Sequence, residues 1–243
     1  MKVLGVIPAR YASSRFPGKP LVDLKGKTMI QRVYEGAMKS ERITKVVVAT
    51  DDHRIYNEVA NFGGVAIMTD ECHPSGTDRC AQVAERYPEM DIIINIQGDE
   101  PLVDYRQLDL LIDSFTNPDT QISTLGNHSI TLEDINNPNR IKIVVNADNQ
   151  AMYFSRSPIP NYKNCSGEPL QNYPYLRHIG LYAYRSSVLK QLTSLEPTQL
   201  EKIESLEQLR WLYYGFQIQI VVTDIETPNI DVPEDVEKVL SLL

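Results

Sequence analysis

Three basic side chains, Arg10, Arg15 and Lys19, are concentrated in the segment VIPARYASSRFPGKPL. Prolines restrict the backbone of this segment, and Gly18 permits close approach to a ligand. Arginine and lysine donate hydrogen bonds to phosphate oxygens and stabilise the negative charge that grows on a departing polyphosphate. The segment is therefore suited to bind a triphosphate, while a solvated surface loop with scattered basic residues is the alternative.

Two aspartates are candidates for a metal site. Asp99 lies in NIQGDEP between a glycine and a proline, where the chain must turn. Mg²⁺ is usually held by one or two carboxylates together with substrate phosphates, so Asp99 is a predicted ligand, with turn formation as the alternative. Asp231 could be the second ligand. Because Asp231-x-x-Glu234 precedes an apolar helix, the local sequence favours a helix-capping role for Asp231.

The segment HPSGTDR precedes a predicted helix. Free backbone N–H groups at Ser75, Gly76 and Thr77 could bind the edge of a base or an anion, and an ordinary helix cap is an equal alternative. Gly26-Lys27-Thr28 imitates the end of a Walker A loop, but that pattern requires glycine where the chain has Leu21, and no GxGxxG is present. Dinucleotide binding is therefore not expected.

Arg156 and His178 flank an irregular region of the chain. A cation and an imidazole of this kind suit a substrate that carries a carboxylate, although an isolated histidine is more often structural. The pair Cys72-His73 with Cys80 lacks a fourth nearby ligand at a standard spacing, so a zinc site is not expected.

The composition limits the partners. The chain has 243 residues, 42% of them hydrophobic, and a formal charge of −8. Phosphate-backbone binding requires a basic face, so neither nucleic acid nor an anionic membrane is an expected partner. No apolar stretch approaches the roughly 20 residues of a membrane helix. The odd number of cysteines and the absence of a CxxC pair argue against a disulfide framework and favour a cytoplasmic location.

The elements that must position these residues alternate between strand and helix. Short β-branched runs with the character of strands buried on both faces occur at residues 2–7, 45–50, 65–68, 91–96, 141–145 and 218–222. Apolar positions at helical spacing lie between them, around Val33, Val59, Val83 and Leu111. The pattern predicts a doubly wound α/β fold with a mostly parallel sheet, in which ligands bind at the carboxyl ends of the strands.

One domain is expected to span residues 1–243, with a subregion at about 146–190 that departs from the core pattern. From about 146 to 180 the chain is rich in proline, tyrosine and asparagine. This excursion is either a flap over a site or a subunit contact, and a solvated loop is the alternative. Ile203, Leu206, Leu209 and Trp211 predict one last long helix.

Eight motifs in order resemble the 3-deoxy-manno-octulosonate cytidylyltransferases, the CMP-Kdo synthetases of bacterial lipopolysaccharide assembly. They are IPARYASSRFPGKPL, VATDD, SGTDR, NIQGDEP, FSRSPIP, LRHIGLYAYR, LEQLR and DVPEDVEKV, and they run from the first predicted strand to the last helix. The resemblance implies a nucleotidyltransferase of Rossmann-like fold. It implies transfer of CMP from CTP to the anomeric hydroxyl of 3-deoxy-D-manno-octulosonate (Kdo), release of pyrophosphate, a requirement for Mg²⁺, and a homodimer in which the excursion contributes to the contact.

The resemblance also implies roles for individual residues. The triphosphate would be held by Arg10, Arg15 and Lys19. The nucleotide would be surrounded by Ala9, Ser75, Gly76, Thr77 and Gln97. Asp99 and Asp231 would ligate Mg²⁺, which reverses the local preference for Asp231 as a cap. The sugar acid would contact Arg79, Arg156, His178, Tyr182, Glu204 and Gln208.

Arg140 departs from this pattern, because a small or apolar residue is expected at its position; its contact is open, and it could bear on the choice of sugar acid. Two other functions are therefore compatible with the sequence. One is the same reaction on a related acid sugar, such as 8-amino-Kdo or a nonulosonic acid. The other is a regulatory module that binds nucleotide without turnover.

Overall fold

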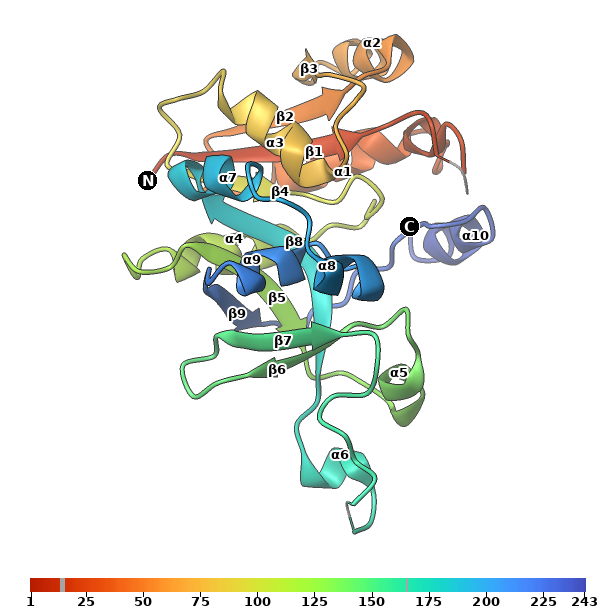
Figure 1. Cartoon of the computed structure of the whole chain (residues 1–243). Coiled ribbons are helices and arrows are strands. Elements are labelled where there is room, and N and C mark those ends of the chain that lie inside the picture. The colour runs from red at the N-terminus through yellow and green to blue at the C-terminus, as the bar shows by residue number, and fades with distance from the viewer. Residues whose placement is uncertain (14–15, 165) are drawn as a thin grey trace.

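A single nine-stranded sheet with helices on both faces forms the core of the protein (Figure 1). The computed structural model describes residues 1–13, 16–164 and 166–243. The strands are β1 (Val3–Ala9), β2 (Lys45–Thr50), β3 (Ala66–Met68), β4 (Ile92–Asn95), β5 (Ile122–Asn127), β6 (Lys142–Val145), β7 (Ala151–Ser155), β8 (Leu176–Arg185) and β9 (Ile218–Val222). The helices are η1 (Lys19–Leu21), α1 (Met29–Ala37), α2 (His53–Asn61), α3 (Gly76–Ala84), α4 (Tyr105–Ser114), α5 (Leu132–Asn136), α6 (Pro169–Asn172), α7 (Ser186–Leu192), α8 (Gln199–Glu204), α9 (Gln208–Tyr213) and α10 (Asp235–Leu240).

The main strand order is β3-β2-β1-β4-β8-β5-β9, with β6 paired to β8 and β7 to β6. Strands β1 to β4 are parallel, β9 is parallel to β5, and β8 is antiparallel to both β4 and β5. The predicted doubly wound, mostly parallel α/β fold is therefore confirmed. Each of the six predicted strands is present, with bounds that differ by a few residues at most.

The apolar runs are continuous because both faces of the sheet are covered. In β1, Leu4 and Val6 pack into the cluster that faces α3, α7 and α9, whereas Val3 and Ile7 pack into the opposite cluster under α1, α2 and α4. Successive side chains of a strand point to opposite faces, so a strand covered on both sides needs apolar residues at every position.

The strand order reverses between β1 and β4, whose carboxyl ends lie side by side. The turn after β4 presses against the end of β1 so closely that a Cβ on Gly98 would lie 2.6 Å from the carbonyl oxygen of Pro8. Only glycine permits this backbone approach without displacement. The loops that carry Arg10 and Asp99 therefore leave the sheet as neighbours.

Two parts of the chain differ from the sequence-based expectation. The predicted last long helix is two short helices, α8 and α9, because Ser205 adopts a left-handed conformation (φ 52°) between them. The excursion is less irregular than expected, since β7 pairs with β6. Among its described residues, those outside helix and strand are 146–150, 156–164, 166–168 and 173–175. The single-domain assignment stays a prediction. Among the described residues, no helix has the length and apolar character needed to cross a membrane.

Candidate active site

Lys19 joins two segments that lie far apart in the sequence. Its ammonium lies 2.9 Å from Oδ2 of Asp99 and donates to the carbonyl oxygen of Ile230 at 2.7 Å. The backbone N–H of Ile230 in turn donates to the carbonyl oxygen of Asp99 at 2.9 Å. Asp231, the next residue, is therefore held in the segment bonded to Asp99, as a shared metal site requires.

The structure contradicts the helix-capping role that the local sequence favours for Asp231. The N-cap residue of α10 is Glu234, which has no side-chain cap hydrogen bond. The carboxylate of Asp235 instead accepts the backbone N–H groups of Asp231 and Val232, at 2.8 and 3.0 Å. Asp231 accepts a hydrogen bond from Asn229 through Oδ2, at 2.7 Å, and its role as a metal ligand stays a prediction.

The loop after β1 meets the start of α3. The guanidinium of Arg10 donates to the carbonyl oxygen of His73, just before the helix. The side chain of Ser75 caps α3, and a Cβ added to Gly76 would lie 3.4 Å from Cγ of Pro8, in van der Waals contact. The predicted nucleotide residues of the two loops are thus brought together. Ala9 is buried at the end of β1, and Arg15 lies outside the described residues.

Glu207 connects the start of α3 with α9 and was not assigned from the sequence. Its carboxylate accepts hydrogen bonds from the hydroxyls of Ser75 (2.9 Å) and Thr77 (2.7 Å). Burial raises the pKa of Glu207, and these two hydrogen bonds oppose the rise. The only sequence signal for Glu207 is its place beside Gln208 in LEQLR.

Aromatic side chains of α9 and β8 pack against one another. The His178 ring lies 5.3 Å from that of Tyr182, whose ring lies 5.2 Å from Trp211. Gln208 is 5% exposed, and its Nε2 has no hydrogen-bond partner among the described residues. A buried donor without a partner is costly unless a ligand or water satisfies it. Two of the predicted sugar residues, His178 and Tyr182, therefore pack together, and Gln208 precedes Trp211 by one turn on α9.

Burial lowers the pKa of His178 to about 3, so the imidazole is neutral. Its Nε2 lies 3.0 Å from the hydroxyl of Thr124, which itself donates to the carbonyl oxygen of Leu181 at 2.7 Å. Because the single Thr124 proton is used in that bond, Nε2 is assigned as the protonated nitrogen. Nδ1 then carries a lone pair that can accept a hydrogen bond from a hydroxyl.

A cavity of about 280 Å³ is lined both by Asp99, a predicted metal ligand, and by His178. Gln97 lies in its wall and donates to the carbonyl oxygen of Gly180 at 2.8 Å. Glu100, also in the wall, accepts from Thr227 at 3.0 Å, and burial together with the charge of Asp99 raises its pKa to about 8. The full lining is Gln97, Asp99, Glu100, Asn139, Arg140, Ile141, Arg177, His178, Ile179, Gly180, Thr227 and Asn229.

Arg79 is enclosed within the protein, beside the end of β2. Its side chain is fully buried, and its guanidinium is paired with Asp51 at 2.6 Å and donates to the hydroxyl of Thr69. Breaking such a buried ion pair by removing one partner is strongly destabilising. The ion pair ties α3 to the end of β2, and the sugar contact of Arg79 stays a prediction.

Arg156 and Glu204 form hydrogen bonds between the end of β7 and α8. The Arg156 guanidinium donates to the carbonyl oxygens of Glu204 (2.7 Å), Pro138 (2.9 Å) and Ser205 (3.3 Å). The Glu204 carboxylate accepts from the hydroxyl of Ser155 (2.7 Å) and the backbone N–H of Arg156 (3.0 Å). Both side chains hold the end of β7 to α8, and their role as sugar ligands stays a prediction.

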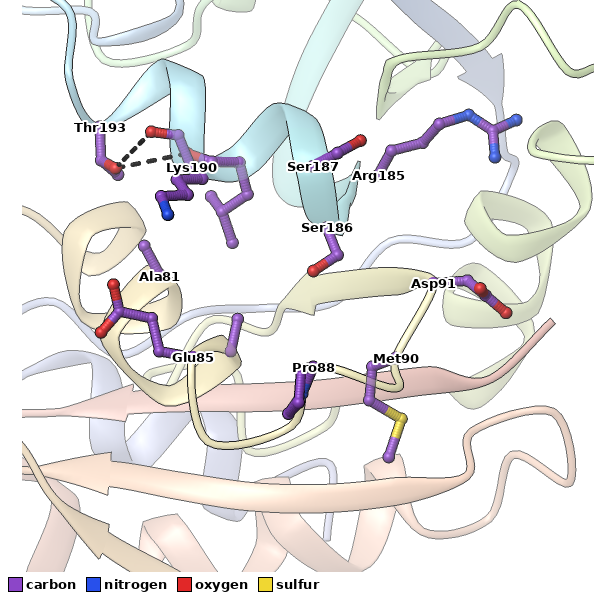
Figure 2. A pocket seen from close by; sticks show the side chains of 12 residues that line it. Ala81, Glu85, Pro88, Met90, Asp91, Arg185, Ser186, Ser187, Lys190 and Thr193 are labelled. Carbon is purple, nitrogen blue, oxygen red and sulfur yellow. Dashed lines mark hydrogen bonds between the residues drawn. The ribbon is translucent and has the colours of Figure 1, made fainter.

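A second, larger cavity of about 710 Å³ lies between α3 and α7 (Figure 2). Met90 and Asp91 line it just before β4 begins, and Arg185 lines it where β8 ends. Arg185 pairs with Ile92, at the opposite end of β4 from Asp99. This cavity therefore lies at the opposite end of the strands from the predicted site residues.

Comparisons with known proteins agree with this geometry. Residues 4–223 match the family model described as cytidylyltransferase. The chain is 49% identical to a 3-deoxy-manno-octulosonate cytidylyltransferase of Parabacteroides distasonis, with 100% of this chain and 98% of the relative covered, and 48% identical to that of Cytophaga hutchinsonii, with 98% and 96% covered. A solved structure of CMP:2-keto-3-deoxy-manno-octonic acid synthetase complexed with CTP superposes with a TM-score of 0.93 at 44% identity, covering 100% of this chain and 98% of that one. The chain belongs to the 3-deoxy-manno-octulosonate cytidylyltransferase family of nucleotidyltransferases.

Proposed function

We propose that this enzyme transfers CMP from CTP to the anomeric hydroxyl of Kdo, giving CMP-Kdo and pyrophosphate for lipopolysaccharide biosynthesis. The observation that carries the proposal is the contact of Lys19 with both Asp99 and the segment of Asp231, at the carboxyl ends of β1 and β4. It joins a proposed phosphate-binding cation to Asp99 and to the segment of Asp231, which are the proposed metal ligands. The names of the relatives and of the CTP complex support the choice of substrates.

In the reaction, the anomeric oxygen forms a bond to the α-phosphorus of CTP while the bond from that phosphorus to the bridging oxygen breaks. The hydroxyl proton is lost to water, and pyrophosphate leaves. The protein's part is to orient the two anions and to offset their repulsion. Arg10 and Lys19 supply positive charge beside the polyphosphate, and Arg15 is proposed to act with them.

The nucleoside is proposed to bind along the start of α3. Its surroundings are Ala9, Ser75, Gly76, Thr77 and Gln97. The Ser75 and Thr77 hydroxyls are both held by Glu207, so this edge is rigid before a ligand arrives. A preorganised edge costs less ordering on binding.

The residues present fit a magnesium ion. Mg²⁺ prefers oxygen ligands from one or two carboxylates, completed by phosphate and water. Asp99 and Asp231 supply such oxygens, and the Lys19 ammonium, itself a cation, already bonds to Asp99 and to the carbonyl oxygen beside Asp231. When bound, Mg²⁺ would neutralise charge on the phosphates.

The acid sugar is proposed to bind against His178, Tyr182 and Gln208. The Nδ1 lone pair of His178 can accept from a sugar hydroxyl, and the unsatisfied Nε2 of Gln208 can donate to one. In the cell we propose a cytoplasmic homodimer with small-molecule substrates and neither nucleic acid nor membrane as a partner. The net charge of −8 supports the last point.

The test is to incubate the purified protein with CTP, Mg²⁺ and Kdo and to measure pyrophosphate and CMP-sugar. Folded protein that releases neither would refute the proposal. A panel with 8-amino-Kdo and a nonulosonic acid, compared by kcat/KM, identifies the acceptor. Asp99→Asn serves as the metal-site control and is expected to lose turnover.

A further inference from the structure

Arg140 stands in the wall between two cavities at the metal side of the site. The cavity of about 280 Å³ brings it together with Asp99 and His178. A neighbouring cavity of about 550 Å³ brings it together with Asp231. Both cavities share Asn139, Arg140, Thr227 and Asn229. Among the described residues, Arg140 is thus the charged side chain that lines both cavities.

The backbone of Arg140 is fixed. Lys142 is fully buried, and its ammonium donates to the carbonyl oxygens of Asn137 (2.9 Å), Arg140 (2.6 Å) and Arg156 (2.7 Å). The N–H of Arg140 also donates to Asn137, at 3.1 Å. These bonds hold the base of the side chain in place at the cavity wall.

The guanidinium of Arg140 is held less firmly than those of its neighbours. The side chain is 40% exposed, and its Nε lies 3.5 Å from Oδ1 of Asp134. The other oxygen of Asp134 already accepts from the backbone and hydroxyl of Thr131. By contrast, Arg156 donates to three carbonyls, and Arg177 is 7% exposed and paired with Glu226 at 2.9 Å. An exposed ion pair of this kind contributes little, so Arg140 can exchange it for a ligand anion.

The anion is more consistent with the sugar than with the nucleotide. The smaller cavity is lined by Gln97 of the proposed nucleotide side and by His178 of the proposed sugar side. Neither Arg10 nor Lys19, the proposed triphosphate ligands, lines either cavity within the described residues. Arginine matches a carboxylate with two parallel hydrogen bonds. Building on the function proposed above, we infer that Arg140 binds the carboxylate of the acid sugar and so determines the preference for an acidic acceptor.

The test compares wild type, Arg140→Ala, Arg140→Gln and Arg140→Lys with Kdo and with its C1 carboxamide. Loss of a charge-assisted contact predicts a KM for Kdo that is about 10- to 100-fold higher in the alanine and glutamine variants, with lysine intermediate. The KM for CTP is expected to stay within about 2-fold. The wild-type preference for the acid over the amide should shrink by the same factor, because the variants no longer sense the charge.

Arg106→Ala is the matched control, since it removes the same charge from an exposed arginine that pairs with Asp104 at the start of α4. Circular dichroism and thermal unfolding confirm that the variants are folded. If the Arg140 variants keep the wild-type preference for the acid, or raise the KM for CTP instead, the inference is wrong while the proposed function stands. If wild type itself makes no CMP-sugar, the proposed function fails first.

Discussion

The ammonium of Lys19 and the carboxylate of Asp99 lie 2.9 Å apart, with exposed fractions of 15% and 28%. One residue comes from the loop after β1 and the other from the turn after β4. Their contact places the cation of a phosphate-binding loop directly on a candidate metal ligand. Substitution of a residue at this site should lower turnover, whereas substitution of a residue that supports the site should lower the stability of the fold.

Lys19→Met should lower kcat/KM for CTP by about 100- to 1,000-fold, because one preorganised charge on the leaving group is lost. Pyrophosphate release measures the effect. Lys27→Met is the control, since Lys27 forms a surface ion pair with Glu35 and should leave turnover unchanged. Equal activity of the Lys19 and Lys27 variants would remove Lys19 from the mechanism.

Gly98→Ala should lower the free energy of unfolding by about 1–3 kcal/mol and reduce activity, because its Cβ would lie 2.6 Å from the Pro8 carbonyl oxygen. Denaturant unfolding and turnover are the measurements. Gly180→Ala is the control for stability, since the nearest atom to its Cβ is Nε2 of Gln97 at 3.9 Å. A Gly98 variant as stable as the Gly180 variant would contradict the close approach of the two strand ends.

Arg79→Met should destabilise the fold by about 3–5 kcal/mol, because it leaves the Asp51 carboxylate without its buried partner. In the folded fraction, the KM for the sugar should be unchanged. The double variant with Asp51→Asn should recover part of the lost stability, as measured by denaturant unfolding. A fully stable Arg79 variant with a raised sugar KM would instead support the sugar contact that the family resemblance implies.

His178 should make the protein less stable as the pH falls. The folded protein keeps the imidazole neutral down to a pKa of about 3, whereas the unfolded chain takes up the proton near its ordinary pKa of 6.5. Stability is therefore lost as the pH falls from about 6.5 towards 3. Between pH 7 and pH 5 the wild type should lose about 2 kcal/mol more than His178→Gln. Parallel stability curves for the two proteins would show that His178 titrates normally.

The sequence predicts the strands whose buried side chains are apolar and misses those with buried polar side chains. Strands β1, β2 and β4 can be recognised because both of their faces need aliphatic side chains. In β5, Ser123 and Thr124 are fully buried, yet they interrupt the apolar pattern. Thr124 is tolerated because its hydroxyl bonds to His178 and to a carbonyl of β8. Such long-range compensation leaves no local periodicity to detect.

The candidate site divides in the same way. Position after a strand is sufficient to single out Asp99 and the basic loop, because parallel strands end at one edge. The partners of a site side chain depend on where distant residues fold. The guanidinium of Arg79 pairs with Asp51, 28 positions earlier, and the hydrogen bond between Glu207 and Ser75 spans 132 positions. Neither contact can be predicted from the residues around the motif.

The bond from Lys19 to Ile230 spans 211 positions and has a consequence for synthesis of the chain. A ribosome that has made the basic loop, β1 and the turn at Asp99 has not yet made the carbonyl that completes the Lys19 contact. Asp231 emerges later still. A growing chain therefore carries the basic loop and Asp99 long before it carries the segment that completes the Lys19 contact.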